Sequence, residues 1–434
     1  MARRGDVAAG RRGGKPLYRA WRADRDSRSA ARRLRQAGVS SIRVRTIDRE
    51  TDFALYCRLI QETFRADDTS DEAVQRRGER YRAEPWYDPD LFRGAFDGDA
   101  LVGGYLFDER VWRIGAARVR TACLGAVCVL PDRRGEGIGA ALVEDVLPHA
   151  RERGLDLVLL DGVPGYYRRF GYVDVHDYEH HIFARADVAA LPRPAIQVRD
   201  ARAEDAPALL ELFDATFSAV DGSFVRDLRD QRWRLAHKGQ MHVAIDERQA
   251  VRGYAASLWR ADRSMIGEIA VADEEALHGM LHWHAGLVAP EVEDLRWFVP
   301  RQSWIYWKLN ERVTLRSERN VRHNAHWMAA PTDPARLLRA LAPDLLGRHL
   351  PAAADGPPPC LAVDNVAYPL PVAVPGLTIG AGEPCGIVLT GADFTQLALG
   401  YRPSESFAVP PAVRAELASL FPSRQLFIPG TDTF

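Results

Sequence analysis

The stretch VCVLPDRRGEGIGAAL, residues 127–142, decides the fold. A strand ends at Leu130, an R-x-x-G-x-G turn follows over residues 134–139, and a helix then carries apolar residues on one stripe at Ile138 and Leu142. Glycines let backbone N–H groups approach an anion closely, and a helix N-terminus adds a partial positive charge. The turn therefore predicts a cradle for a diphosphate, to which Arg133 or Arg134 can add charge-assisted hydrogen bonds.

Two other phosphate-binding patterns do not fit this turn. A dinucleotide fingerprint needs G-x-G-x-x-G after the first strand, and a P-loop needs G-K-[ST]; neither pattern is present. The remaining alternative is a glycine-rich turn between a strand and a helix that holds no ligand.

Outward from this turn, strands and helices alternate as in a mixed sheet. The opening pattern of strand, acidic turn and amphipathic helix occurs twice, in RTIDRETDFALYCRLIQETF (45–64) and IQVRDARAEDAPALLELFDATF (196–217). This repeat, offset by about 154 positions, predicts an internal duplication. Where the second half should have its cradle, MIGEIAVADEEALHGM (265–280) carries acidic residues, so we expect the second half to bind no cofactor.

Proline-rich stretches mark the breaks between domains. LPRPAI (191–196) reads as a stiff linker, and APTDPA (330–335) opens the last segment. The first forty residues are strongly basic and have almost no aliphatic periodicity, so they cannot offset the entropy of ordering. We expect a disordered tail over 1–40, a catalytic domain over 41–190, a degenerate copy over 191–330 and a third domain over 331–434.

Composition excludes several classes of protein. Among the 434 residues, 58 Lys and Arg balance 59 Asp and Glu, so no global basic field recruits nucleic acid. No apolar run reaches the roughly 18 residues of a membrane helix. The five cysteines form no C-x-x-C pair, which favours free thiols in a reducing compartment. The sequence thus predicts a cytoplasmic protein with no nucleic-acid partner and no membrane span.

A second motif, GYYRRFGY, lies at residues 165–172. Together with the V-x-V strand and the R-x-x-G-x-G turn, it resembles the GNAT superfamily of acetyl-CoA-dependent N-acetyltransferases over about residues 85–175. Tandem halves followed by a sterol-carrier-protein-like segment resemble, more narrowly, the enhanced intracellular survival (Eis) acetyltransferases. The resemblance implies an α/β (α+β) fold, with two tandem GNAT-like mixed-sheet domains, a sterol-carrier-protein-like α+β domain, and a homo-oligomer, a hexamer.

The resemblance also implies an acetyl-CoA site. In such enzymes the backbone of the V-x-V strand pairs with the pantetheine arm like an added strand. The turn and helix start hold the pyrophosphate, and the loop after the next strand flanks the arm. The family usually has a small polar residue where this chain has Gly162. The residues implied are Val127, Cys128, Val129, Arg134, Gly135, Glu136, Gly137, Ile138, Gly139, Ala140, Gly162 and Val163.

Two residues are implied as catalytic. Tyr167 is the tyrosine three residues before F-G-Y, the family's general acid, and a phenol with a pKa of about 10 can protonate the departing thiolate. Phe434 ends the chain, and Eis-type enzymes use the terminal carboxylate of a final aromatic residue as base. An α-carboxyl with a pKa of about 3.5 needs desolvation or a relaying water for that role. The alternatives are a core aromatic and a solvent-exposed tail.

The acceptor is least determined by the sequence. FRADDTSDEAVQ (64–75) includes Asp67 and Asp68 in a region that walls the acceptor pocket in the family, and clustered carboxylates would attract cationic amines. The alternative is a solvated acidic turn. His278, His282 and His284 have no carboxylate or cysteine at ligand spacing, so we expect no metal.

The leading hypothesis is therefore an N-acetyltransferase acting by direct transfer from acetyl-CoA to a primary amine, of an aminoglycoside-like polyamine or of a lysine. The rival hypothesis is a lipid or hydrophobic-ligand carrier that uses the last hundred residues and keeps a vestigial acetyltransferase domain. An intact R-x-x-G-x-G turn and Tyr167 favour the enzyme.

Overall fold

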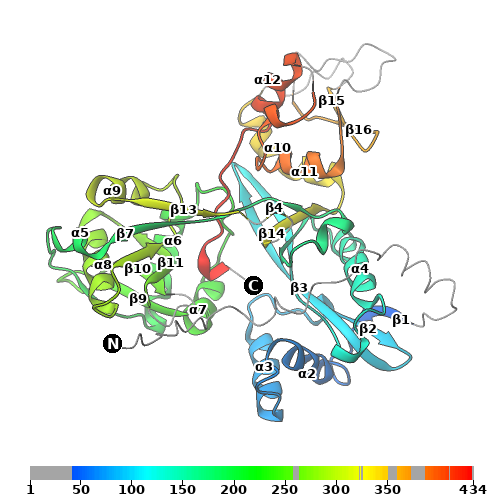
Figure 1. Cartoon of the computed structure of the whole chain (residues 1–434), viewed down its shortest axis with the longest axis horizontal. Coiled ribbons are helices and arrows are strands. Elements are labelled where there is room, and N and C mark those ends of the chain that lie inside the picture. Colours follow the sequence, from blue (N-terminus) through cyan, green and yellow to red (C-terminus); the bar gives the residue numbers. More distant parts are fainter. Residues whose placement is uncertain are drawn as a thin grey trace, which may run out of the picture.

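Two large sheets and one small sheet organise the chain in a computed structural model, which describes residues 42–257, 263–321, 323, 326–349, 359–372, 387–409 and 411–432. Figure 1 shows three bodies, each built around one sheet. The mixed sheets with helices on their faces confirm the expected α/β class. The tail expected over residues 1–40 lies outside the described residues.

The first sheet has seven strands in the order β1-β2-β3-β4-β5-β14-β6. β1 to β4 are antiparallel neighbours, β4 pairs in parallel with β5, and β14 is antiparallel to β5 and β6. The strands are β1 (Ile42–Thr46), β2 (Phe92–Asp97), β3 (Ala100–Ile114), β4 (Ala117–Val129), β5 (Leu157–Gly162), β6 (Val173–Asp174) and β14 (His326–Pro331). The helices are α2 (Phe53–Phe64), α3 (Asp71–Ala83), α4 (Ile138–Glu152) and the short η2 (Pro89–Leu91), η3 (Pro131–Arg133) and η4 (Tyr167–Phe170).

Helix α4 packs on one face of the first sheet. Its stripe of Ile138, Leu142 and Val146 is fully buried there, as the apolar spacing predicted. Residues that alternate along β4 and β5 point to the opposite face and join the core of the third domain. The sheet is thus buried on both sides, which fixes the position of the turn between β4 and α4.

Two strands cross the boundary expected between residues 190 and 191. β7 (Tyr178–Ala184) falls within the range expected for the first domain, 41–190, but lies in the second sheet, between β13 and β12. β14 (His326–Pro331) falls at the end of the range expected for the second domain, 191–330, but lies in the first sheet, between β5 and β6. Each sheet therefore includes one strand from beyond its expected range.

The second sheet repeats the plan of the first, in the order β13-β7-β12-β11-β10-β9-β8. β8 to β11 are antiparallel neighbours, and β11 pairs in parallel with β12, as β4 does with β5. The other strands are β8 (Gln197–Asp200), β9 (Gln240–Ile245), β10 (Val251–Ser257), β11 (Met265–Val271), β12 (Asp294–Trp297) and β13 (Arg316–Asn320). The helices are α5 (Arg185–Ala189), η5 (Ala203–Asp205), α6 (Ala206–Phe217), α7 (Leu228–His237), α8 (Glu274–Leu287) and α9 (Trp304–Arg312).

The third domain is small and packs its helices against the first sheet. Leu337 and Leu341 of its first helix share one buried cluster with Trp112 and Val119 of β3 and β4. Its sheet has the order β16-β15-β17. Its elements are α10 (Pro334–Leu346), β15 (Cys360–Val363), β16 (Val366–Pro369), β17 (Val388–Leu389), α11 (Gly391–Ala398), η7 (Ser404–Ser406), α12 (Pro411–Leu420) and η8 (Gly430–Asp432).

The cysteines depart in part from the expectation of free thiols. Cys57, Cys123 and Cys128 are buried and free. Cys360 is disulfide-bonded, so the expectation of five free thiols is wrong at this position.

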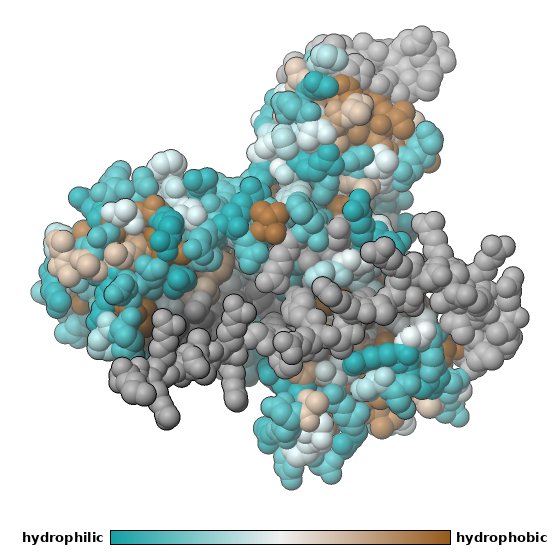
Figure 2. Space-filling view, in the orientation of Figure 1, coloured by the Kyte–Doolittle hydropathy of each residue, from teal (hydrophilic) through white to brown (hydrophobic). Residues whose placement is uncertain are grey.

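The surface is mostly polar over the first two domains in the view of Figure 2, and hydrophobic residues gather on the third domain. Val366 of β16 and Val388 of β17 are more than half exposed there. Across the described ranges, no helix is both long and apolar enough to cross a membrane.

Candidate active site

The central feature of the first domain is an irregularity in β4. Gly104 of β3 pairs with Cys128, but Leu106 pairs with Gly125, so β4 has one extra residue between these pairs. Ala126 adopts a left-handed backbone with φ of 49°. This β-bulge turns the end of β4 away from its parallel neighbour.

Beyond the bulge, β4 has no strand partner on the β5 side. β5 pairs only with residues 121–124 of β4, whereas β3 continues along β4 to Val129. Val127 and Val129 are only partly buried. The backbone of residues 125–129 therefore presents one edge to which an extended ligand can add hydrogen bonds in the manner of a strand.

The turn after β4 forms an anion cradle. Gly135 and Gly137 have φ of 88° and 85°, a left-handed conformation that glycine adopts without steric cost. Gly137 precedes α4, whose N-terminus has no side-chain cap. A Cβ built on Gly135 would have no atom within 4 Å, so the space above the turn is open. Free N–H groups, a helix dipole and open space fit the diphosphate of acetyl-CoA.

The two arginines of the turn have different roles. Arg133 forms ion pairs with Glu136 at 2.8 Å and with Asp97 at 2.9 Å, so both Arg133 and Glu136 are engaged within the protein. Arg134 is exposed, and among the described residues it forms no hydrogen bond or ion pair. Of the two candidates, Arg134 is the one available to a phosphate.

Tyr167 lies at the start of η4, directly after the loop that follows β5. Its ring packs edge-on against Tyr166 and Tyr172, with centroids 5.1 and 5.9 Å apart. Burial, reinforced by the neighbouring Tyr166 and Asp161, raises the pKa of Tyr167, so its hydroxyl stays protonated at neutral pH. Within the described chain, that hydroxyl forms no hydrogen bond, and it is available to a ligand.

Gly162 departs from the family pattern for a steric reason. A Cβ at this position would lie 3.0 Å from the Met328 sulfur and 3.2 Å from the Tyr167 ring. A small polar side chain would therefore push against the tyrosine. Val163, the next residue, is 45% exposed and lies at the open side of the loop.

The cradle and the tyrosine segment meet at Tyr166. A Cβ on Gly139 would lie 2.7 Å from the Tyr166 hydroxyl and 3.7 Å from a methyl of Val129. The end of β4, the first turn of α4 and η4 thus converge on one region. Sequence reasoning assigned Tyr166 no functional role, because the closeness of its hydroxyl to Gly139 depends on the tertiary fold.

Asp67 and Asp68 lie in the exposed turn between α2 and α3. Asp68 accepts a hydrogen bond from the Ser70 hydroxyl at 2.7 Å and pairs with Arg76 at 3.4 Å. The Ser70 hydrogen bond is the main cause of its lowered pKa. Asp68 thus organises the local turn, whereas Asp67 makes no hydrogen bond or ion pair within the described chain.

Sequence reasoning missed a group of titratable residues in which Asp108 is buried and Glu84 and Lys238 are half-buried. Burial raises the pKa of Glu84 to about 8 and that of Asp108 on β3 to about 6, and it lowers the pKa of Lys238 to about 8. Arg110 stacks on the Trp86 ring at 3.6 Å beside them. These residues join the first domain to the second, and no local spacing in the sequence relates them.

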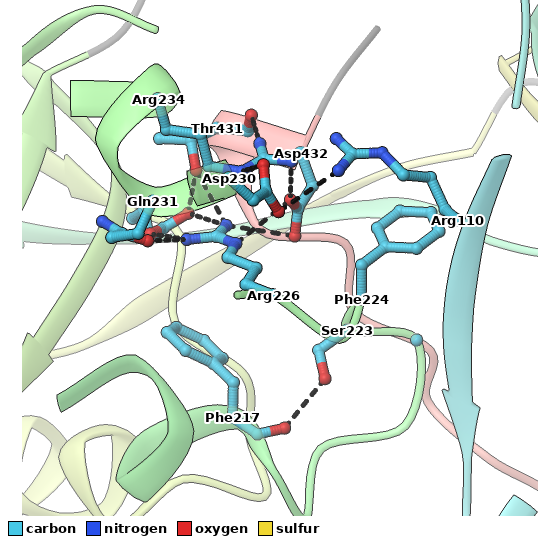
Figure 3. Close-up of polar contacts among 12 residues, drawn as sticks. Arg110, Phe217, Ser223, Phe224, Arg226, Asp230, Gln231, Arg234, Thr431 and Asp432 are labelled. Atoms are coloured by element: carbon cyan, nitrogen blue, oxygen red, sulfur yellow. Dashed lines mark hydrogen bonds and ion pairs between the residues drawn. The ribbon is translucent and has the colours of Figure 1, made fainter. Parts of the chain in front are cut away.

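The C-terminal segment was only partly foreseen. In Figure 1 it descends from the third domain and ends between the second domain and β3. Its last described residue, Asp432, is buried against Arg226 and Arg234 (Figure 3). Phe434, proposed from the sequence as the base, lies outside the described residues.

No metal site is indicated in the described part of the chain, where no group of three or more His, Cys, Asp and Glu residues could hold an ion. His284 instead accepts a hydrogen bond from Trp297 at 2.8 Å, and its other ring nitrogen lies 2.9 Å from the Arg263 carbonyl.

Comparison with known proteins agrees with this geometry. The family described as acetyltransferase (GNAT) domain matches residues 43–174. Over 125 residues the chain is 33% identical to the mycothiol acetyltransferase of Geodermatophilus obscurus, a match that covers 27% of this chain and 38% of that protein. The chain thus matches well under two thirds of this curated relative.

Solved structures resemble nearly the whole chain. A GCN5-related N-acetyltransferase from Anabaena variabilis has a TM-score of 0.66 at 14% identity, covering 91% of this chain and all of that one. One from Kribbella flavida has a TM-score of 0.65 at 19% identity, covering 91% and 98%. Eis1 from Mycobacterium abscessus has a TM-score of 0.62 at 17% identity, covering 90% and 100%. At these identities the likeness concerns the fold, and it confirms two GNAT-like domains followed by a smaller third one. The match of residues 43–174 to the acetyltransferase (GNAT) domain family supports an N-acetyltransferase.

Proposed function

We propose that this chain is an acetyl-CoA-dependent N-acetyltransferase that transfers the acetyl group directly to a primary amine. One observation carries the proposal: an open glycine turn, with an uncapped helix N-terminus, lies beside a bulged strand and a tyrosine whose hydroxyl has no partner in the described chain. These are the parts needed to hold a thioester and to protonate its leaving sulfur.

Acetyl-CoA would lie across the end of β4. The backbone of Val127, Cys128 and Val129 would pair with the pantetheine arm, and residues 134–140 would hold the diphosphate. Arg134 would add a charge-assisted hydrogen bond, since Arg133 is engaged by Glu136 and Asp97. Gly162 and Val163 would flank the arm on the other side.

The amine nitrogen attacks the thioester carbonyl carbon, and backbone N–H groups near Val129 stabilise the oxyanion that forms. The C–S bond then breaks, and the departing thiolate takes the hydroxyl proton of Tyr167. The proton that the nitrogen loses goes to a base, for which we propose the terminal carboxylate of Phe434. Two groups thus handle the two protons, and no covalent enzyme intermediate is needed.

A cationic acceptor, such as an aminoglycoside-like polyamine or a lysine-type amine, suits the carboxylates near the site. Asp67 has no partner within the described chain. Asp108, buried on β3, pairs across the sheet with Cys123 of β4, three residues before the bulge at Ala126. Carboxylates in these positions would attract a positively charged amine.

The domain order supports a narrower proposal, an enzyme of the Eis type with a sterol-carrier-protein-like third domain and a hexameric assembly. The C-terminal segment returns from the third domain to the other two, where Asp432 pairs with Arg226 and Leu426 packs in the same cluster as Trp112 of β3, as a catalytic C-terminus requires. Light scattering of the purified chain tests the assembly, and a monomer would contradict it.

Titration of the protein with acetyl-CoA, followed by calorimetry, tests the central proposal. We expect one molecule bound per chain, because only the first domain has the open turn. Release of free coenzyme A is then measured with a panel of polyamines, lysine peptides and the acceptor used by mycothiol acetyltransferase. Absence of both binding and amine-dependent release would contradict the proposal.

A further inference from the structure

The second domain has a region equivalent to the acetyl-transfer centre of the first. In both domains the fourth strand pairs in parallel with the fifth for only part of its length, ending at Leu124 in β4 and at Ile266 in β11. Glu268 is two residues beyond Ile266, as Ala126 is two residues beyond Leu124. The pairing of β10 with β11 also shifts register at this point. Glu268 therefore stands where the first domain has its bulge.

This second centre is filled by the protein's own C-terminal segment. Arg226, from the loop between α6 and α7, donates to both carboxylate oxygens of Glu268, at 2.9 and 2.8 Å. Its Nη2 also donates to the Thr431 hydroxyl at 2.8 Å, and that hydroxyl donates to Glu268. Asp432 completes the group, 3.1 Å from Arg226 and 2.8 Å from Arg234. Figure 3 shows Arg226, Arg234 and Asp432 pointing toward one another.

Charges in this group balance only when the tail is in place. Arg110, Arg226 and Arg234 face three carboxylates, those of Asp230, Glu268 and Asp432. The side chains of Arg226, Arg234 and Asp432 are completely buried. Loss of one partner would leave a buried charge uncompensated, which is strongly unfavourable. The tail therefore supplies a charge that the second domain needs.

The second domain also contacts the C-terminal segment (residues 424–432, the tail) before Thr431, at Arg424 and Phe427. A Cβ on Gly222 would lie 2.5 Å from the Phe427 backbone nitrogen, so only glycine leaves room for the tail. The Phe427 N–H donates to the Asp221 carbonyl at 2.7 Å, and its ring stacks on Phe217. Arg424 pairs with Asp221 at 3.0 Å. The tail is thus seated on the second domain over most of residues 424–432.

The same group reaches the catalytic domain. Arg110 is on β3, opposite Thr121 of β4, and it pairs with Asp230 at 3.2 Å. Phe434, the proposed base, is linked to Asp432 through one residue, so the contacts that fix Asp432 limit the positions open to the proposed base.

We propose that the transfer centre of the second domain has become a receptor for the chain's own C-terminal segment, with Asp432 and Arg234 as positioning residues for the terminal carboxylate. The docking stands on the contacts above, and the positioning role rests on the proposed function. The duplicated domain, which lacks a cofactor turn, then takes part in acetyl transfer by holding the base.

Asp432→Asn in the full-length chain tests the proposal, with Thr431→Val as a second variant that keeps the side-chain shape. Asp205→Asn is the matched control, because the buried Asp205 carboxylate pairs with the partly exposed Arg199 in the same domain at 2.7 Å, away from the C-terminal segment. Hydrogen exchange of residues 425–432 should rise at least tenfold in the first two variants and stay unchanged in the control. Unchanged protection of the tail in both variants would overturn the docking.

Kinetics test the positioning role. Asp432→Asn should lower kcat by about 10²-fold, the cost of misplacing a reacting group by about 1 Å, with little change in KM for acetyl-CoA. Combined with deletion of Phe434, it should lower kcat no further than the deletion alone. If the effects of Asp432→Asn and of the deletion on kcat multiply, the positioning role is overturned. If the deletion alone leaves kcat unchanged, the proposed base is wrong and positioning fails with it, whereas the exchange measurement still decides the docking.

Discussion

The two GNAT-like domains share a strand order but differ at the helix that follows the fourth strand. In the first domain α4 begins after two left-handed glycines and has no side-chain cap. In the second, Asp273 caps α8 by accepting a hydrogen bond from the Ala276 N–H at 2.9 Å, and two glutamates occupy the first turn. The start of α8 is thus capped by the protein itself, whereas the N–H groups at the start of α4 have no side-chain cap.

The two domains also differ in what lies on the transfer centre. In the first, the acidic turn with Asp67 is exposed. In the second, the C-terminal segment covers Glu268, and residues 426–432 of that segment are buried. The second domain thus keeps the strand order of the first, while side chains of the C-terminal segment occupy the region equivalent to the proposed transfer centre.

The largest effect should come from making the first cradle resemble the second. Gly137→Asp places a negatively charged carboxylate where the diphosphate would lie. The carboxylate then occupies the anion site at the helix N-terminus and repels the phosphates. We expect the affinity for acetyl-CoA to fall by at least about 10³-fold, about 4 kcal/mol, measured by calorimetry.

Gly154→Asp is the control for this variant. Gly154 also has a positive φ, 76°, but it follows the C-terminal end of α4, at the other end of that helix from the cradle, and its nearest neighbours are the flexible ends of Arg120 and Arg336. The substitution imposes similar backbone strain away from the cradle, so the affinity for acetyl-CoA should not change. Unchanged affinity in Gly137→Asp would show that the diphosphate lies elsewhere.

A second effect should follow from the C-terminal segment, in which Thr431 and Asp432 contact Arg226 of the second domain. Deletion of Phe434 moves the terminal carboxylate by one residue, about 3.5 Å, outside hydrogen-bond reach. We expect turnover to fall by about 10²-fold, as for a lost base, while acetyl-CoA affinity stays the same. A His tag added after Phe434 should act likewise, and an N-terminal tag should not. A C-terminally tagged enzyme of full activity would refute the carboxylate's role.

Local features of the sequence predicted the cradle and the buried stripe of α4 because each depends on residues within one turn or one helix. The exchange of β7 and β14 could not be predicted, since either sheet accepts an apolar strand and only long-range pairing decides. The group around Asp432 joins residues 206 positions apart, so no spacing relates them. The sequence could not explain Gly162, because the Tyr167 ring next to the place of its missing side chain is brought there by the fold.

A third effect concerns Tyr167, the proposed acid. Its hydroxyl forms no hydrogen bond with the described residues, whereas Tyr254 on β10 in the second domain donates to Glu268 at 2.6 Å. Tyr167→Phe should lower turnover about 10- to 100-fold by removing the proton donor. Because burial raises the pKa of Tyr167, the wild-type turnover should not decline from loss of this proton between pH 7 and 10. Tyr254→Phe is the matched control for acetyl-CoA affinity. A decline centred below pH 9 that disappears in Tyr167→Phe would contradict a raised pKa.

The smallest effect should come from the exposed acidic turn, the counterpart of the loop that carries Arg226 in the second domain. In the second domain, Arg226 of that loop donates hydrogen bonds to Glu268. In the first domain, Asp67 has no partner within the described residues. An exposed carboxylate attracts a cation only weakly, because water and salt screen the charge. Asp67→Asn should therefore raise KM for a polyamine about two- to fivefold and leave KM for acetyl-CoA unchanged.

Asp68→Asn separates attraction of the acceptor from local structure. Its carboxylate accepts from Ser70 and pairs with Arg76, and this partnership lowers its pKa, so its contribution to stability is present above pH 4 and is lost only as the pH falls further. At neutral pH the substitution should lower the melting temperature by about 1–2 °C with little effect on KM. If Asp67→Asn also leaves KM for the polyamine unchanged, at low salt as well as at high salt, the turn faces only water. The amine must then be held by the buried carboxylates at the junction of the two domains, where Asp108→Asn would raise KM instead.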